Sequence, residues 1–243
     1  MKASERYISI VKSLIDGVES TQSDMIEKAA SMTADALVSG GYVFTFGTGH
    51  SHILAEEIFY RAGGIARVYP ILEDSLMLHK AAARSSALER ISGLASALLD
   101  DIDAVKCGGV LFLFSNSGCN TVAIEMAEEA GKRGLKTICI TNVTHSSKMI
   151  SRHPKGLKLM DVCDVVIDNK GCYGDAAVEI NGTMTGPTST VIGAMIMEAI
   201  VCRAVEIASE TAEPEIFASA NTIGGDAKNA GIIEKYKPII KPL

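Results

Sequence analysis

The chain has 243 residues, of which 47% are hydrophobic and 21% charged, and its formal net charge is −6. This composition is typical of a globular domain with a sizeable core, which needs no disulfide or metal to hold it together. The acidic balance excludes general binding of nucleic acid, which requires a basic face. The six cysteines form no CxxC pair and several lie in apolar runs, which indicates buried thiols in a reducing compartment.

Membrane insertion and secretion are disfavoured by two segments. The most apolar stretch, STVIGAMIMEAIVCRAVEIA, is interrupted by Glu198, Arg203 and Glu206, which a membrane span would carry at high cost. The N-terminal segment has periodic apolar positions instead of the continuous apolar run of a secretory signal. We therefore expect a cytoplasmic protein without membrane contact.

In chain order, residues 3–39 show helical spacing of apolar positions and predict an N-terminal helical region, with a break or cap between Ser20 and Ser23. Short apolar runs then predict five buried strands, at 42–46, 65–72, 110–115, 136–142 and 162–169. Helix-like segments separate the first four strands, at 52–62, 74–106 and 121–134.

Residues 144–160 are polar and predict a loop or short helix, and the Gly- and Thr-rich residues 172–190 predict a loop. A long apolar helix is expected from Pro187 to about Ser209, with a less regular tail after Pro214. The alternation of strands and helices predicts a parallel sheet covered on both faces. We expect a single domain, with a helical region at 1–39, an α/β core at 40–210 and a tail at 211–243.

Two Gly- and Ser-containing turns each follow a strand and precede a helix. They are Gly47-Thr48-Gly49-His50-Ser51 and the segment from Ser115 to Thr121. Backbone N–H groups and the dipole at a helix start favour an anion, and glycine lets a ligand approach the backbone closely. The first turn lacks the third glycine of GxGxxG and the chain has no GxxxxGK[ST], which disfavours dinucleotide and nucleoside triphosphate sites.

The segments FGTGHSHILAEE, FSNSGCNT and TGPTSTVIGAMIMEAI resemble the SIS (sugar isomerase) domain family of phosphosugar isomerases and phosphosugar-binding proteins. The likeness is strongest to an uncharacterised subgroup labelled phosphoheptose isomerase-like. It implies a five-stranded parallel sheet flanked by helices, in a doubly wound, flavodoxin-like order. It also implies a phosphorylated sugar as ligand, no cofactor, and assembly as a dimer or tetramer.

The resemblance also assigns the binding residues. The family's phosphate turn matches Ser115, Asn116, Ser117 and Gly118. The family usually has a further hydroxyl residue two positions after the glycine; here Asn120 stands at that position and Thr121 follows it. Ser51 matches the serine of the family's first turn. The candidate phosphate- and sugar-binding residues are therefore Gly47, Gly49, Ser51, Ser115, Asn116, Ser117, Gly118, Asn120, Thr121, Thr188 and Ser189. Thr188 and Ser189 open the last helix, so capping is the alternative role for them.

No metal is expected. Phosphoheptose isomerases carry a His and a Glu where this chain has Glu57 and Arg61, so zinc chemistry is not carried over. His50 and His52 are two residues apart and point to different faces of a helix.

The expected reaction is an aldose–ketose isomerisation of a sugar phosphate or amino sugar phosphate, which needs a carboxylate base and an acid. The candidate bases are Glu56, Glu57 and Glu179, and the candidate acids are His52, His79 and His153. Arg152 and His153 either close over the sugar phosphate or form a solvated basic loop. Two alternatives stay open: a noncatalytic phosphosugar sensor, although no basic helix-turn-helix is present, and a phosphosugar lyase or etherase.

The N-terminal helical region and the last helix carry more apolar surface than a monomer covers readily. A homodimer or homotetramer is therefore expected, the alternative being that both helices belong to the core of a monomer.

Overall fold

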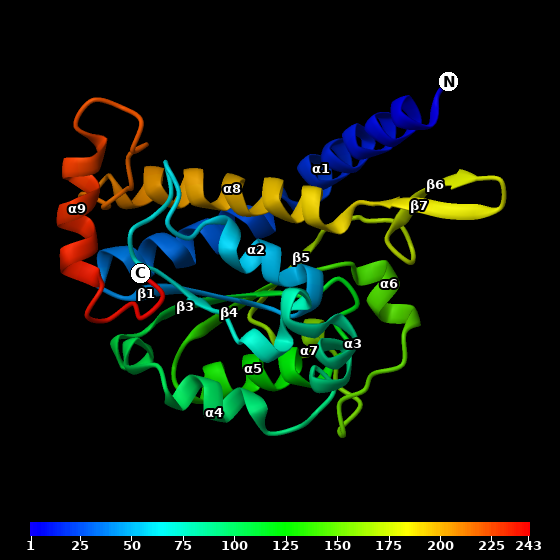
Figure 1. Ribbon diagram of the computed structural model, residues 1–243, viewed down its shortest axis with the longest axis horizontal. Helices are drawn as coiled ribbons and strands as arrows, with labels where there is room; N and C mark the ends of the chain where they lie inside the picture. The colour runs from blue at the N-terminus through cyan, green and yellow to red at the C-terminus, as the bar shows by residue number, and fades with distance from the viewer.

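In the computed structural model, which describes all 243 residues, five parallel strands form one twisted sheet (Figure 1). They are β1 (Tyr42–Gly47), β2 (Val68–Ile71), β3 (Gly109–Phe114), β4 (Lys136–Thr141) and β5 (Val165–Asp168). Their order across the sheet is β2-β1-β3-β4-β5. The predicted number, location and parallel arrangement of the strands are confirmed.

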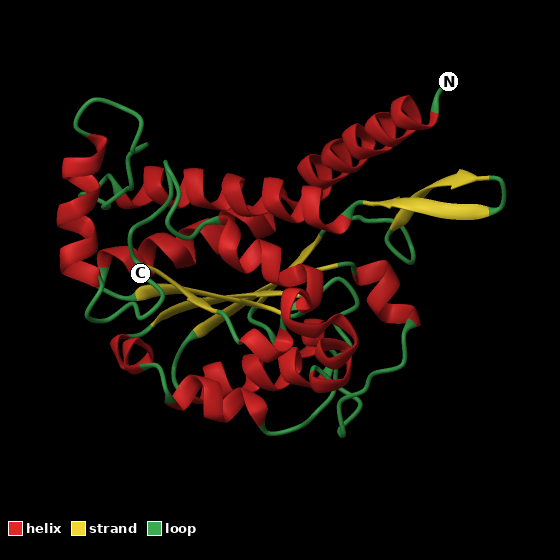
Figure 2. Cartoon of the chain, viewed as in Figure 1, coloured by secondary structure: helices red, strands yellow, loops and turns green.

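Helices cover both faces of the sheet (Figure 2). Along β3, Val110, Phe112 and Phe114 face one core, which they share with α1 (Ala3–Val38), α2 (His52–Glu57) and α8 (Ser189–Ala208). Leu111 and Leu113 face the other core, with α4 (Leu94–Asp100), α5 (Thr121–Lys132), α7 (Leu159–Val162) and α9 (Gly225–Tyr236). Burial on both faces explains why the strand is a continuous apolar run.

The connections contain shorter helices than the sequence predicts. Residues 74–106 are divided among η2 (Asp74–Leu76), α3 (Leu78–Leu88), α4 and η3 (Asp103–Cys107). Gly93 has φ 93° and ends any helical run there. The helix expected at 52–62 stops at Glu57, and Tyr60 adopts φ 47°, which a helix does not allow. The polar segment 144–160 contains α6 (Val143–Lys148) and the start of α7.

The N-terminal region is one unbroken helix, so the expected break at Ser20 to Ser23 is wrong. The Thr21 hydroxyl donates to the Gly17 carbonyl at 2.7 Å, and the Ser23 hydroxyl donates to the Glu19 carbonyl. These hydroxyls bind carbonyls one turn back inside the helix instead of capping a new one. With 36 residues, α1 is roughly 54 Å long at 1.5 Å per residue.

The segment 172–190, expected to be a loop, contains an antiparallel hairpin of β6 (Ala176–Ile180) and β7 (Thr183–Pro187). Its tip, Asn181-Gly182, has positive φ at both residues, which is the geometry of a two-residue hairpin turn. The hairpin projects beside the N-terminal part of α1 (Figure 1). The Tyr7 hydroxyl donates to the Pro187 carbonyl at 2.7 Å, which ties the two segments together.

The tail is more regular than expected, because it contains the helix α9, which begins at Gly225. Ile232, Tyr236 and Ile240 are buried against the second core. Burial of Ile232 and Tyr236 stabilises a helix that has little amphipathic pattern of its own, and Ile240 continues the contact just beyond its end.

Because the sheet is packed on both faces, removing a large side chain from its centre should strongly lower the free energy of unfolding. Phe112 is fully buried in the middle of β3, so Phe112→Ala should lower the free energy of unfolding by about 3–5 kcal/mol. Urea unfolding followed by circular dichroism measures this. Ile223→Ala, at a fully exposed position, is the control, and equal stability of the two variants would contradict the assignment of Phe112 to the core.

Candidate functional site

The candidate site lies where the chain reverses its direction across the sheet. β1 and β3 are neighbours, but the chain passes from β1 outward to β2 before returning to β3. Gly47 at the end of β1 pairs with Phe114 at the end of β3, so the turns after both strands meet at one edge. In open α/β sheets ligands bind in the crevice at this topological switch point. The two turns singled out in the sequence are the two that flank it.

The first turn depends on a close backbone approach. A Cβ on Gly47 would lie 2.3 Å from the Ser51 carbonyl oxygen, so no other residue fits without a shift. Gly49 has φ 57° and begins η1 (Gly49–Ser51), after which His52 starts α2. The chain therefore turns directly from the strand into the helix with Thr48, Gly49 and Ser51 partly exposed at the edge.

The second turn offers several unpaired donors. Gly118 has φ 60°, and its N–H donates to the Ser115 hydroxyl at 3.1 Å. The backbone N–H groups of the other turn residues have no acceptor within the chain; they belong to Asn116, Ser117, Cys119 and Asn120. Buried or half-buried N–H groups normally find a partner, so this turn is suited to an anion.

A guanidinium group lies beside this turn. Arg152 donates from Nη1 to the Asn120 side-chain oxygen at 2.8 Å, and its N–H donates to the Cys119 carbonyl at 2.9 Å. The Thr121 hydroxyl in turn donates to the Arg152 carbonyl at 3.0 Å. The basic segment is thus fixed onto the turn by three hydrogen bonds, and it brings a positive charge there.

Besides Ser115 and Asn120, which accept the hydrogen bonds described above, two more of the predicted binding side chains of this turn are engaged within the protein. The Asn116 side-chain oxygen accepts from the Asn169 amide at 3.0 Å. The Thr121 hydroxyl is used in the contact with Arg152 described above. Ser117, which is half-buried, makes no side-chain hydrogen bond and is the free hydroxyl of the turn.

Histidine and acidic side chains gather beyond the first turn. His52 Nε2 lies 3.3 Å from Glu56 Oε1, one helical turn away on α2. Burial lowers the pKa of His52, while Glu56 acts in the opposite direction, and His79 and Asp74 lie close enough to influence it as well. Two predicted residues, His52 and Glu56, are therefore brought together, with the imidazole of His52 almost enclosed.

Glu57 is directed elsewhere. It pairs with Arg61, which also lies 3.3 Å from Glu198 on α8. Burial raises the pKa of Glu198. Glu57 and its neighbours line a shallow surface cavity of about 370 Å³ with Ile53 and Phe59.

The structure does not bring Glu179 to the two turns. It is exposed on the hairpin, where its carboxylate accepts from the Gly182 N–H and its carbonyl accepts from Arg6 at 3.0 Å. Within one chain it is tied to α1 and the hairpin tip.

The start of α8 is occupied by a carboxylate of the same chain. Asp175 accepts from the N–H groups of Thr188 and Ser189 at 2.9 and 2.8 Å, and from both of their hydroxyls. The capping role is therefore filled here, with a negative charge at the positive end of the helix dipole. A ligand contact at these two residues would require Asp175 to move away.

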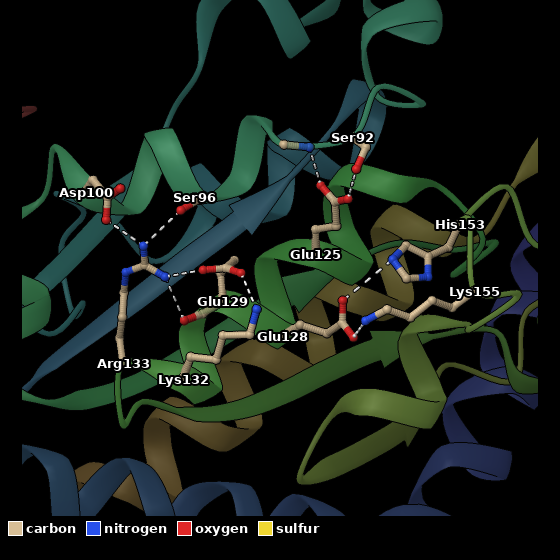
Figure 3. Close-up of polar contacts among 11 residues, drawn as sticks. Ser92, Ser96, Asp100, Glu125, Glu128, Glu129, Lys132, Arg133, His153 and Lys155 are labelled. Carbon is tan, nitrogen blue, oxygen red and sulfur yellow. Dashed lines mark hydrogen bonds and ion pairs between the residues drawn. The ribbon is translucent and has the colours of Figure 1, made fainter.

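His153 lies in a separate polar cavity of about 290 Å³ along α5 (Figure 3). Its Nε2 is 3.6 Å from Glu128, which also pairs with Lys155 at 3.1 Å. Nearby, Glu125 accepts from the Ser92 hydroxyl and from the Gly93 N–H. The acidic side chains of this cavity are paired with donors of the same chain, and His153 does not reach the crevice.

One carboxylate at the crevice escaped the sequence analysis. Glu89, at the end of α3, accepts from the Thr48 hydroxyl at 2.7 Å, and its carbonyl accepts from the Val122 N–H at 3.1 Å. It joins the first turn to the helix that follows the second. No local motif marks this glutamate, because its position depends on how the 74–106 segment crosses the sheet edge.

No three His, Cys, Asp or Glu side chains gather in an arrangement that could hold a metal ion. No helix has the length and apolar character that crossing a membrane requires.

The fold, with its two turns at the switch point, is that of a SIS domain protein, and the SIS domain family model matches residues 6–142. A UPF0309 protein of Geobacillus kaustophilus is 42% identical over 241 residues, covering 98% of this chain and 96% of that protein. A UPF0309 protein of Listeria monocytogenes is 39% identical over 233 residues, covering 95% and 94%. The chain belongs to the UPF0309 family of SIS domain proteins.

Among solved structures, a phosphoheptose isomerase from Francisella tularensis matches with a TM-score of 0.50 and 16% identity. The match covers 87% of this chain and all of the other. At this identity the similarity establishes the fold alone, and it confirms the α/β arrangement with a five-stranded parallel sheet.

The burial of His52 predicts a measurable titration. Its imidazole should protonate below the usual value near 6.5, because enclosure penalises the charged form. The unfolded chain then binds the proton more readily than the folded chain. Protonation of His52 should therefore lower the free energy of unfolding as the pH falls below about 6.5.

NMR titration of the imidazole signals, with His52→Gln for assignment, measures the midpoint. The pH dependence of urea unfolding should be flatter in His52→Gln than in the wild type, whereas His50→Gln serves as the exposed control. A His52 midpoint at or above the usual value would show that Glu56 outweighs burial.

Proposed function

We propose that the protein binds a phosphorylated sugar at the switch-point crevice and isomerises it by proton transfer between adjacent carbons. The observation that carries this proposal is the second turn, with its four unpaired N–H groups and the adjacent Arg152 guanidinium. A dianionic phosphate matches both features, since it accepts several hydrogen bonds and pairs with arginine. The family membership and the fold are consistent with such a ligand.

Within this proposal the phosphate is the nonreacting anchor. Its binding energy holds the sugar carbons toward the first turn, beyond which His52 and Glu56 are paired. A carboxylate then removes a proton from the carbon next to the carbonyl, and an acid supplies one to the carbonyl oxygen. The enediol formed in this way collapses to the isomeric sugar without any change in overall oxidation state.

The anchor is tested by two substitutions in the second turn and its basic neighbour. Arg152→Ala should weaken binding of a sugar phosphate about 10- to 100-fold, because a charge-assisted contact is lost. Ser117→Ala should weaken it by a smaller factor, about 3- to 10-fold. Calorimetric titration with hexose, heptose and amino sugar phosphates, and with the unphosphorylated sugars, measures these changes.

Lys155→Ala is the matched control, because Lys155 is a cation of the same segment that pairs with Glu128 away from the turn. Equal affinity of the wild type and the Arg152→Ala variant would remove the second turn as the anchor. Binding without turnover of any sugar phosphate would favour the sensor over the isomerase.

We also propose that two copies of this chain associate through α1, α8 and the hairpin. Figure 1 shows the N-terminal part of α1 and the hairpin projecting from the body of the molecule. These projections expose Ile8, Ile180 and Met184, and α8 exposes Val191. Alongside them, an apolar cavity of about 290 Å³ lies between α1 and α8, lined by Ile15, Ile26 and Met195 among others. A twofold partner would cover these apolar positions.

Light scattering tests the assembly. The wild type should have at least twice the 25.7 kDa chain mass at micromolar concentration, and the Ile8→Asp, Met184→Asp double variant should shift toward the monomer. Ile223→Asp, at an exposed position in the tail, should leave the mass unchanged. A single wild-type species at the chain mass would refute the proposal.

A further inference from the structure

The carboxylate of Glu89 occupies a place in the crevice that no other glutamate shares. Its Oε2 accepts from the hydroxyl of Thr48, between the two glycines of the first turn. Its carbonyl accepts from the Val122 N–H, in the first turn of α5. Glu89 is therefore fixed to the first turn and to the start of α5, on the two sides of the switch point, and is only half-buried.

One oxygen of this carboxylate is free. Oε2 is held by Thr48, and Oε1 makes no hydrogen bond or ion pair with the protein. No cation of the chain pairs with the group within 4.0 Å. A general base needs a fixed position and an uncommitted oxygen, and Glu89 has both.

The other carboxylates considered for this role are committed. Glu56 is paired with His52 and its side chain is 55% exposed. Glu57 is paired with Arg61, and Glu179 lies on the projecting hairpin with its carboxylate on the Gly182 N–H. Each would have to give up a partner, or be supplied by another chain, before it could act in this crevice.

From this geometry we propose that Glu89 is the general base of the site, an assignment that rests on the proposed isomerase function. Oε1 takes the proton from the carbon next to the carbonyl, and the electron pair of that C–H bond forms the enediol double bond. The carbonyl oxygen accepts a proton from water or from a histidine of the first turn. Glu89 then returns its proton to the neighbouring carbon, the enediol collapses to the new carbonyl, and the proton taken up by oxygen is balanced by one released.

The decisive variant is Glu89→Gln, which keeps the size of the side chain and an oxygen that can accept from Thr48. Binding of the sugar phosphates should change by less than about threefold, whereas kcat should fall by about 100-fold or more, as expected for loss of a general base. In heavy water, wild-type enzyme should wash deuterium into the carbon next to the carbonyl, and the variant should not. Glu128→Gln, another partly buried glutamate outside the crevice, should retain wild-type turnover and exchange.

Glu89→Asp is the second test, because it keeps the charge but retracts it by one methylene. It should lower kcat by about tenfold or more with little change in KM. Circular dichroism and thermal unfolding establish that each variant is folded.

The outcomes separate this assignment from the proposed function. If the wild type turns over a sugar phosphate and kcat is undiminished in Glu89→Gln or Glu89→Asp, only the assignment of Glu89 as the general base is overturned. Loss of exchange in Glu56→Gln or Glu57→Gln, with exchange retained in Glu89→Gln, would move the base to that residue. Loss of binding in Glu89→Gln would make it a binding residue, and absence of both turnover and exchange in the wild type would overturn the function and the base together.

Discussion

The pairing of β1 with β3 is the constraint on which the rest of the site depends. This register sets Gly47 opposite Phe114, so the two strands end together and both polar turns open at the same edge. β2 lies on the other side of β1, which leaves no crossover helix directly between the two turns. The unpaired N–H donors of one turn and the His52–Glu56 pair beyond the other thus lie at the same edge of the sheet.

The position of α8 determines what surrounds this edge. Its residues Ile192, Ile196 and Ile200 are fully buried against the sheet, and α1 packs along it on the same face. The ion pair between Glu27 and Arg203 joins these two helices at 2.9 Å, but it is exposed, and solvent screens such a pair. Apolar burial therefore fixes the layer, and the projecting end of α1 with its hairpin is what remains for a partner.

The pairing of charges distinguishes Glu89 from the other carboxylates of the molecule discussed above. Asp175 caps α8, Glu57 neutralises Arg61, and Glu128 is shared by His153 and Lys155. Each of these groups has a structural partner that satisfies its charge. Glu89 is bound by a single hydroxyl, which orients the carboxylate without neutralising it.

The sequence by itself determined the strands, their parallel arrangement and the two turns, because buried parallel strands are continuous apolar runs and glycines are required where backbones approach closely. It also predicted the family. It missed the hairpin, although the Asn181-Gly182 pair is a local signal for one, and it divided α1 where hydroxyls in fact bind within the helix. The contacts of Arg152 and Glu89 were decided only by the tertiary structure. Each contact joins segments about 30 to 40 residues apart in the chain, Arg152 to Asn120 and Glu89 to Thr48. Such contacts depend on how the connecting segments pack over the edge of the sheet. Local sequence spacing does not encode this packing.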